Sequence, residues 1–223
     1  VSPSPSVHLS AKETRSLQNH PVIKAMHVKL TNRLLLCTVM LLYVAAVKGA
    51  ICTLTPDGVG NVVIPSNWTA ITTKAFDSCE TLVSVTIPDD SMLAEIESSA
   101  FYSCTSLTTV TIGSNSKITR IQEKAFYKTA LSSFTIPATL KIIEQYAFQS
   151  CESLASMTVP SNSQLAGIGD YAFSRTAIVS LNIPGTVTTL GSSIFQYCTA
   201  VTTVNFGDNS MLTTLGTNVL QGL

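Results

Sequence analysis

The chain has 223 residues, of which 45% are hydrophobic and only 12% charged, a composition that excludes an intrinsically disordered protein. The formal net charge is zero, but residues 1–49 hold six basic residues and one acid, whereas residues 50–223 hold seven basic residues and twelve acids. A mildly acidic segment with scattered charges offers no phosphate-binding face, so we expect no nucleic-acid partner.

Residues 1–25 contain no methionine and three prolines, and we interpret them as upstream translated sequence or a disordered tail. Residues 26–49 begin with Met26 and have the composition of a signal peptide. In that segment Lys29 and Arg33 precede a run of 14 uncharged residues, which is shorter than the roughly 20 that span a bilayer.

We predict that this leader is cleaved after Gly49, with Ala46 and Ala50 as competing sites. One alternative is an uncleaved signal anchor, whose basic start would stay in the cytoplasm and leave the following residues outside the cell. A second alternative is a buried hydrophobic helix.

After a lead-in at residues 50–56, residues 57–223 repeat one pattern. Each repeat holds an apolar pair at a fixed place: Ala75-Phe76, Ala100-Phe101, Ala125-Phe126, Ala147-Phe148, Ala172-Phe173, Ile194-Phe195 and Val219-Leu220. Successive pairs are 25, 25, 22, 25, 22 and 25 residues apart, so only two lengths occur. Strand-like units such as LVSVTIP, from Leu82, alternate with these pairs, and an early copy at Val59 makes seven strand units. A fixed period of this size predicts a solenoid.

Alternation within a strand unit predicts which side chains face the core. In the unit that begins at Leu82, we expect Leu82, Val85 and Ile87 to point inward and the polar residues between them to point outward. Ile96 is then expected to line a second side of the coil. Length differences between repeats fall in turns, so the inward ladder keeps its register. One repeat cannot cover its own apolar side chains, and the repeats must therefore stack and fold cooperatively.

No group in residues 50–223 suits catalysis or metal binding. All three histidines, His8, His20 and His27, come earlier, so a Ser-His or Cys-His nucleophilic site and an imidazole zinc site are excluded from this segment. We interpret the carboxylate pairs as solvated turn charges: Asp89-Asp90 and Glu95/Glu97. The glycines end strands or turns and form no phosphate loop. We expect no catalytic residue, no metal and no cofactor.

Cys79, Cys104, Cys151 and Cys198 share one repeat position, which indicates small core residues. Stacking brings Cys79 and Cys104 near disulfide range, but parallel side chains in register converge poorly, and we predict free buried thiols. Cys151 and Cys198 are separated by a repeat without cysteine and are expected to be too far apart to bond. Cys52 has no clear partner.

Asn67-Trp68-Thr69 is the only N-glycosylation sequon of the chain. In a secreted eukaryotic protein Asn67 would carry a glycan on an early turn, although such sequons are common by chance. We expect Trp68, the single tryptophan, to pack against the N-terminal cap and not to bind sugar.

The outward positions of the strand units form a ladder of hydroxyl and amide side chains without a charge. They are Ser84, Thr86, Thr109, Thr111, Ser133, Thr135, Ser156, Thr158, Ser180, Asn182, Thr203 and Asn205. Strand propensity and solubility explain such a row. The alternative is a flat binding face for protein or glycan, because repeat arrays bind across such sheets.

The pattern L-x-x-V-x-I-P…I-x-x-x-A-F-x-x-C-x-x-L resembles the BspA-type leucine-rich repeat family over residues 57–223. The resemblance implies a β-rich leucine-rich-repeat solenoid with short parallel strands and short helical or irregular turns. It also implies a surface or secreted protein of a mucosal bacterium or a parasitic protist that adheres to host cells or matrix. The sequence departs from the family at an exposed turn, where several repeats lack glycine after the isoleucine: Glu97, Gln122 and Glu144.

We therefore expect an extracellular binding protein, not an enzyme, whose partner is a protein or glycan on a host cell or matrix. Membrane contact is expected only through the leader or a C-terminal anchor. One alternative is the ectodomain of a receptor-like signalling protein, which a membrane span beyond Leu223 would favour. Another is an ice- or mineral-ordering surface, which the unequal repeat lengths disfavour. No polar cap follows Val219-Leu220, so we predict that the array is truncated.

Overall fold

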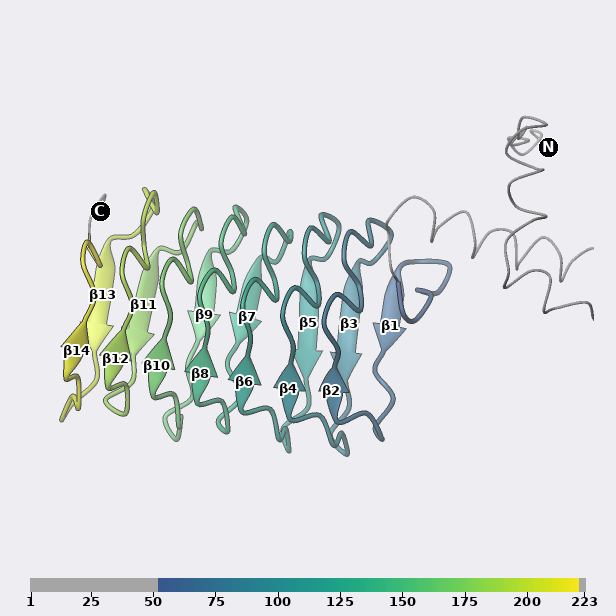
Figure 1. Ribbon diagram of the computed structural model, residues 1–223, viewed down its shortest axis with the longest axis horizontal. Helices are drawn as coiled ribbons and strands as arrows, with labels where there is room; N and C mark the ends of the chain where they lie inside the picture. The colour runs from purple at the N-terminus through teal and green to yellow at the C-terminus, as the bar shows by residue number, and fades with distance from the viewer. Residues whose placement is uncertain (1–51, 221–223) are drawn as a thin grey trace, which may run out of the picture. The chain divides into compact units, whose positions relative to one another are not determined.

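A computed structural model describes residues 52–220 of the chain. The interpretations of residues 1–25 and of the leader at residues 26–49 lie outside these described residues. The described part is a stack of coils, each with one longer and one shorter strand (Figure 1). It contains no helix, so the connections are irregular turns, and it offers no helix that could cross a membrane.

The longer strands coincide with the seven strand units expected from the sequence, and this prediction is confirmed. They are β1 (Asn61–Val63), β3 (Ser84–Ile87), β5 (Thr109–Ile112), β7 (Ser133–Thr135), β9 (Ser156–Thr158), β11 (Ser180–Ile183) and β13 (Thr203–Phe206). All pair in parallel, but in two sheets, with the order β1-β3-β5 in the first and β7-β9-β11-β13 in the second. We call these two sheets together the long-strand side.

The division between β5 and β7 coincides with a change in the core. Val85 and Val110 are paired inward-facing residues of β3 and β5, whereas β7 offers the ring of Phe134. That ring lies 5.4 Å from the ring of Phe126 and 5.0 Å from the ring of Phe148. A bulkier inward side chain thus begins the second sheet.

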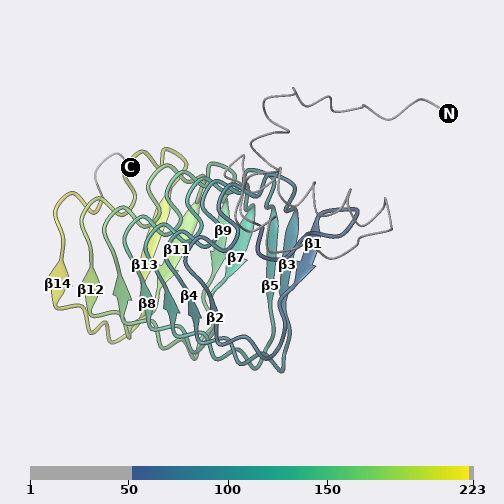
Figure 2. The ribbon, with the colours of Figure 1, turned by 45° about the vertical axis from the view of Figure 1, so that its right-hand side comes forward.

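The shorter strands form one continuous parallel sheet of seven, which we call the short-strand side. They are β2 (Ala70–Ile71), β4 (Glu95–Ile96), β6 (Arg120–Ile121), β8 (Ile142–Ile143), β10 (Gly167–Ile168), β12 (Thr189–Leu190) and β14 (Thr214–Leu215). Figure 2 shows that the two sides line different faces of the coils. The sequence predicted that Ile96 lines a second side, and Ile96 is fully buried there. It did not predict that this side consists of paired strands.

A stack of phenylalanine rings fills the core where the chain turns between the two sides. Neighbouring ring centroids lie between 5.1 and 6.1 Å apart along the series Phe76, Phe101, Phe126, Phe148, Phe173 and Phe195. Backbone hydrogen bonds also join each of these turns to the same turn of the next coil. For example, the Phe76 N–H donates to the Ala100 carbonyl at 2.7 Å. Two residues in each of the first six of these turns have left-handed backbone, for example Ser99 and Ser103, which bends the chain around the ring.

The inward set predicted from alternation is confirmed, because Leu82, Val85 and Ile87 are all buried. The described core extends without interruption from Val62 to Val219. A segment spanning residues 50–223 therefore contains the whole described core and can fold without the leader.

Cys52 and Cys79 form a disulfide, with Cα atoms 5.5 Å apart. The predictions that Cys79 is a free thiol and that Cys52 lacks a partner were wrong. The reason lies in the lead-in, which covers the first coil in the place of a preceding repeat. There the N–H and hydroxyl of Thr53 both donate to the Ala75 carbonyl, at 2.8 and 2.6 Å. The lead-in thereby closes the N-terminal end of the stack.

Candidate binding face

The structure brings the predicted outward residues together in rows across the long-strand side. Ser84 pairs with Thr109 in the first sheet, and Ser133, Ser156, Ser180 and Thr203 follow one another in the second. A second row pairs Thr86 with Thr111, Thr135 with Thr158, and Asn182 with Asn205. Ten of the twelve side chains are exposed, and those of Ser84 and Thr86 are half-buried. We call these twelve residues the polar face.

The polar face is partly tied together by its own hydrogen bonds. The Asn205 amide donates to the Asn182 amide oxygen at 3.0 Å, and the Ser84 hydroxyl donates to Asn61 at 2.6 Å. Asn61 thus extends the face by one coil, a member that the sequence reading missed because β1 breaks the Ser/Thr pattern. Since the sheets are separate between β5 and β7, the face is two adjoining platforms and not one continuous lattice.

The cysteines of the inner coils are structural. The thiols of Cys104, Cys151 and Cys198 are buried and free, as predicted. Each donates to the carbonyl of a phenylalanine one coil earlier, at 2.8, 3.0 and 2.9 Å respectively. Burial raises the pKa of Cys104 to about 12 and that of Cys151 to about 11, so these two are protonated and unreactive at neutral pH.

Of the four carboxylates interpreted as solvated turn charges, Glu95, Glu97 and Asp89 make contacts within the fold. Glu95 lies in β4 and not on a turn, which corrects the sequence interpretation, and the Arg120 guanidinium lies 3.9 Å from Glu95 and 2.8 Å from Glu144. Asp89 does lie on a turn, where the hydroxyl and N–H of Ser114 lower the pKa of its carboxyl group. Within residues 52–220 no group of three or more His, Cys, Asp or Glu side chains could hold a metal ion.

A row of tyrosines and lysines follows the turns that carry the phenylalanine stack, and sequence reasoning missed it. Tyr102 stacks on Tyr127 at 4.9 Å and Tyr146 on Tyr171 at 5.3 Å, while the Lys124 ammonium lies 5.2 Å from the centre of the Tyr146 ring. The available signal was positional, since each of these tyrosines directly follows the phenylalanine or stands two residues before it. These stacked rings are half-buried and brace neighbouring coils.

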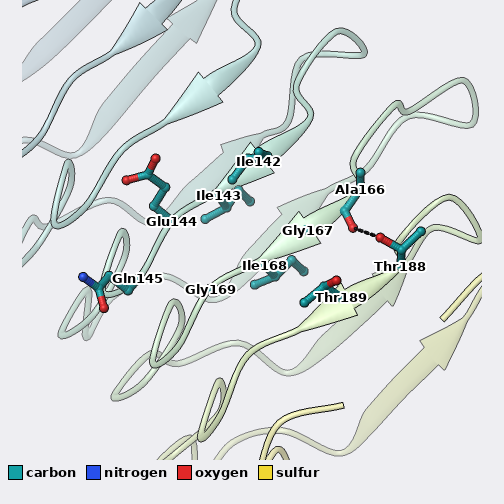
Figure 3. Close-up of a pocket in the computed structure, with 10 residues that line it drawn as sticks. All are labelled: Ile142, Ile143, Glu144, Gln145, Ala166, Gly167, Ile168, Gly169, Thr188 and Thr189. Atoms are coloured by element: carbon teal, nitrogen blue, oxygen red, sulfur yellow. Dashed lines mark hydrogen bonds between the residues drawn. The ribbon is translucent and has the colours of Figure 1, made fainter. Parts of the chain in front are cut away.

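Hollows open on the surface of the described residues. One, of about 530 Å³, lies on the short-strand side over β8, β10 and β12 (Figure 3). Another, of about 320 Å³, lies beside Asn67 and Trp68 near the N-terminal end. Trp68 is half-buried and packs against the core, as its predicted role in the cap requires, and Asn67 is exposed on the turn between β1 and β2. Glycosylation of Asn67 stays a prediction.

With this geometry in view, a family model for the BspA type leucine rich repeat region matches residues 57–122 and 119–223, in six copies. The chain belongs to the BspA-type leucine-rich repeat family. The fold expected from the sequence, a BspA-type array of seven parallel coils, is confirmed. Membership of this repeat family is consistent with protein binding, and proteins of such families are typically not enzymes. No curated protein matches the chain.

Solved structures of other leucine-rich repeat proteins are similar to this chain. The pneumococcal vaccine antigen PcpA has a TM-score of 0.63 at 23% identity, over 70% of this chain and 43% of its own. The leucine-rich repeat protein of T. pallidum has a TM-score of 0.61 at 27% identity, over 73% and 76%. A leucine rich cell surface protein from Faecalibacterium prausnitzii A2-165 scores 0.48 at 28% identity, over 68% and 48%. This BspA-type chain thus spans less than half the length of PcpA and of the Faecalibacterium protein.

Proposed function

We propose that this BspA-type array is a secreted or surface-displayed adhesion module that binds a protein or glycan on host cells or matrix through the polar face. The observation that carries the proposal is the polar face itself, which is uncharged, exposed and held in register by parallel strands. Short hydroxyl and amide groups on a rigid sheet can make many weak polar contacts with a partner at little cost in side-chain entropy.

Two further observations support an extracellular site of action. The leader of residues 26–49 has the basic start and the uncharged run of a signal peptide. The disulfide between Cys52 and Cys79 belongs to an oxidising compartment, because cytosolic thiols are kept reduced. The receptor-like ectodomain remains the alternative, and no residue of the described array favours it over adhesion.

The proposal is tested with residues 50–223 displayed on beads and exposed to epithelial cells and to immobilised fibronectin, laminin and collagen. The decisive variant is Ser133→Lys/Ser156→Glu/Ser180→Lys, which places opposite charges on paired neighbours and so preserves the sheet. The control is Ala70→Lys, on the short-strand side, which places the new charge beside its paired neighbour Glu95 and lies outside the polar face.

We expect the wild-type array and the control to bind at least one of these surfaces and the polar-face variant to lose that binding. Circular dichroism of each variant confirms that it is folded. If no surface retains the wild-type beads, the adhesion proposal fails. If the polar-face variant binds as well as wild type, adhesion uses another surface.

A further inference from the structure

Gly167, in β10, differs from the other glycines of the short-strand side. A Cβ atom added to Gly169, Gly191 or Gly216 would collide with backbone of the preceding coil, so packing requires glycine there. A Cβ atom added to Gly167 would meet nothing within 4 Å. The fold therefore has no packing reason for glycine at position 167.

Side chains occupy the same place in every other coil. The residues in register with Gly167 on β2, β4, β6, β8, β12 and β14 are Ala70, Glu95, Arg120, Ile142, Thr189 and Thr214. Glycine weakens a strand, because it gains nothing from packing and loses more backbone entropy on folding. A strand glycine often marks a bulge, a tight bend or a place where another group approaches the backbone closely. Gly167 pairs in regular register with Ile142 and Thr189, so it does not lie in a bulge.

Gly167 forms the floor of the larger hollow, of about 530 Å³. Ile142 rises on one side of it, and Thr188 and Thr189 lie on the other, as Figure 3 shows. Ala166 completes the apolar lining. The hollow exists because β10 lacks the side chain that its two neighbouring strands carry.

The polar groups at the rim are mostly satisfied within the chain. The Glu144 carboxylate accepts hydrogen bonds from Arg120 at 2.8 Å and from the Glu123 N–H at 3.1 Å, and the Thr188 hydroxyl donates to the Ala166 carbonyl at 3.1 Å. A charged group or a sugar with many hydroxyls would lose its bonds to water here without replacing them. An uncharged apolar side chain would lose nothing and would bury alkyl surface.

We infer that this hollow is an anchor site for a single aliphatic or aromatic side chain of a protein partner. The side chain enters over the bare backbone of Gly167 and packs against Ile142 and Ala166. This site lies on the short-strand side and is separate from the polar face.

The test uses residues 50–223 with labelled isoleucine and alanine methyl groups, titrated with N-acetyl-leucinamide and N-acetyl-tryptophanamide and followed by NMR. We expect saturable shifts at the methyl groups of Ile142 and Ala166. Gly167→Val should fill the hollow and weaken this binding by about tenfold or more, because the new side chain occupies the site of the probe. Gly58→Val, at the other glycine whose Cβ would meet nothing, is the matched control and should leave the shifts unchanged.

Thermal unfolding separates occlusion from misfolding. Gly167→Val should raise the Tm slightly, because valine favours a strand, and Gly167→Ala serves if the larger residue perturbs the sheet. The inference is overturned if the chemical shift changes persist in both glycine variants or if neither amide produces any. It is also overturned if N-acetylglucosamine produces larger shift changes than the amides do. These outcomes do not depend on whether the beads of the adhesion experiment bind cells.

Discussion

The first and last described coils of the array are built from the same repeat, yet their apolar residues differ in burial. In the first coil Ile71 and Phe76 are fully buried, because the lead-in covers them on one side and the second coil on the other. In the last coil the corresponding Leu215 and Leu220 are 61% and 53% exposed. No described residue covers the far side of that coil.

The burial of an apolar residue in this fold therefore depends on the neighbouring coils and not on the repeat alone. An inner coil has a partner on each face, the first coil has the disulfide-bound lead-in as a substitute partner, and the last described coil has one partner. Stability in such an array is a sum of coil and interface contributions. Equivalent substitutions should therefore have unequal costs along the stack.

The largest difference is expected at the second residue of the apolar pair that each repeat holds. Phe126→Ala removes a fully buried ring that contacts Phe101, Phe148 and Phe134, and should lower the free energy of unfolding by about 3–5 kcal/mol. Leu220→Ala, at the same repeat position in the last coil, should cost less than about 1 kcal/mol, because half of the side chain is already exposed.

Urea unfolding followed by far-ultraviolet circular dichroism measures both variants. Equal losses for the two would contradict the dependence of burial on neighbours.

The next largest effect is expected at the N-terminal cap. Cys52→Ser removes a disulfide that closes a loop of sequence separation 27, and should lower the free energy of unfolding by about 3 kcal/mol. The first coil should then resemble the last, with faster amide exchange at Ile71 and its neighbours. Native-state hydrogen exchange measures this, with the amides around Phe173 as the internal reference.

A reducing agent supplies the control for this prediction. It should lower the Tm of the wild-type array and leave the Tm of Cys52→Ser unchanged. A wild-type Tm insensitive to reductant would show that the lead-in stays docked without its covalent bond.

A smaller effect is expected where inner coils replace the covalent link with hydrogen bonds. Thr129, in a short repeat without cysteine, places its buried hydroxyl 3.2 Å from the Cys151 sulfur. Thr129→Val should cost about 1 kcal/mol, because it removes this bond while keeping the shape of the side chain. Thr199→Val, at an exposed position beside Cys198, should change the free energy of unfolding by less than about 0.5 kcal/mol. Urea unfolding measures both variants.

The sequence predicted those parts of the fold that depend on periodicity. The strand units, the inward set around Val85 and the outward polar residues all follow from period-2 alternation repeated at a fixed interval. The structure places every residue of the predicted polar face outward on the long-strand side, although its role in binding stays a proposal. Periodicity was sufficient here because the same alternation of apolar and polar residues recurs in every coil.

The sequence could not predict features that occur once or that leave no periodic mark. The partner of Cys79 lies in the lead-in, outside the repeat, so comparison among repeats pointed only to free thiols. Two-residue strands such as β4 are too short to show alternation, which is why Glu95 was placed on a turn. Gly167 resembled a turn glycine until its register with Ile142 and Thr189 placed it inside a sheet.

The smallest expected effect concerns pH and again separates the ends from the interior of the array. N–H groups of Asn61 and Val59 lower the pKa of Asp57 near the cap, and Ser114 lowers the pKa of Asp89 between the second and third coils. A lowered folded-state pKa stabilises the fold fully above the ordinary value of 3.8, and this contribution is lost as the pH falls through the folded-state pKa.

The raised pKa of Lys124, held by its hydrogen bond to Glu123, acts in the opposite direction, and its contribution is lost only above the ordinary value of 10.5. We therefore expect a Tm that is flat between about pH 5 and pH 8 and falls slightly below this window, because the acids are exposed and screened by solvent. Above the ordinary thiol value of 9.0 the Tm should fall further, because the buried Cys104 and Cys151 stay protonated in the fold while the thiols of the unfolded chain ionise. Scanning calorimetry across pH measures the Tm. Asp89→Asn keeps an acceptor oxygen for Ser114 but cannot titrate, so it should reduce the fall in Tm at acidic pH. A steep loss of stability between pH 5 and 8 would contradict this account, because no group described in the core titrates in that range.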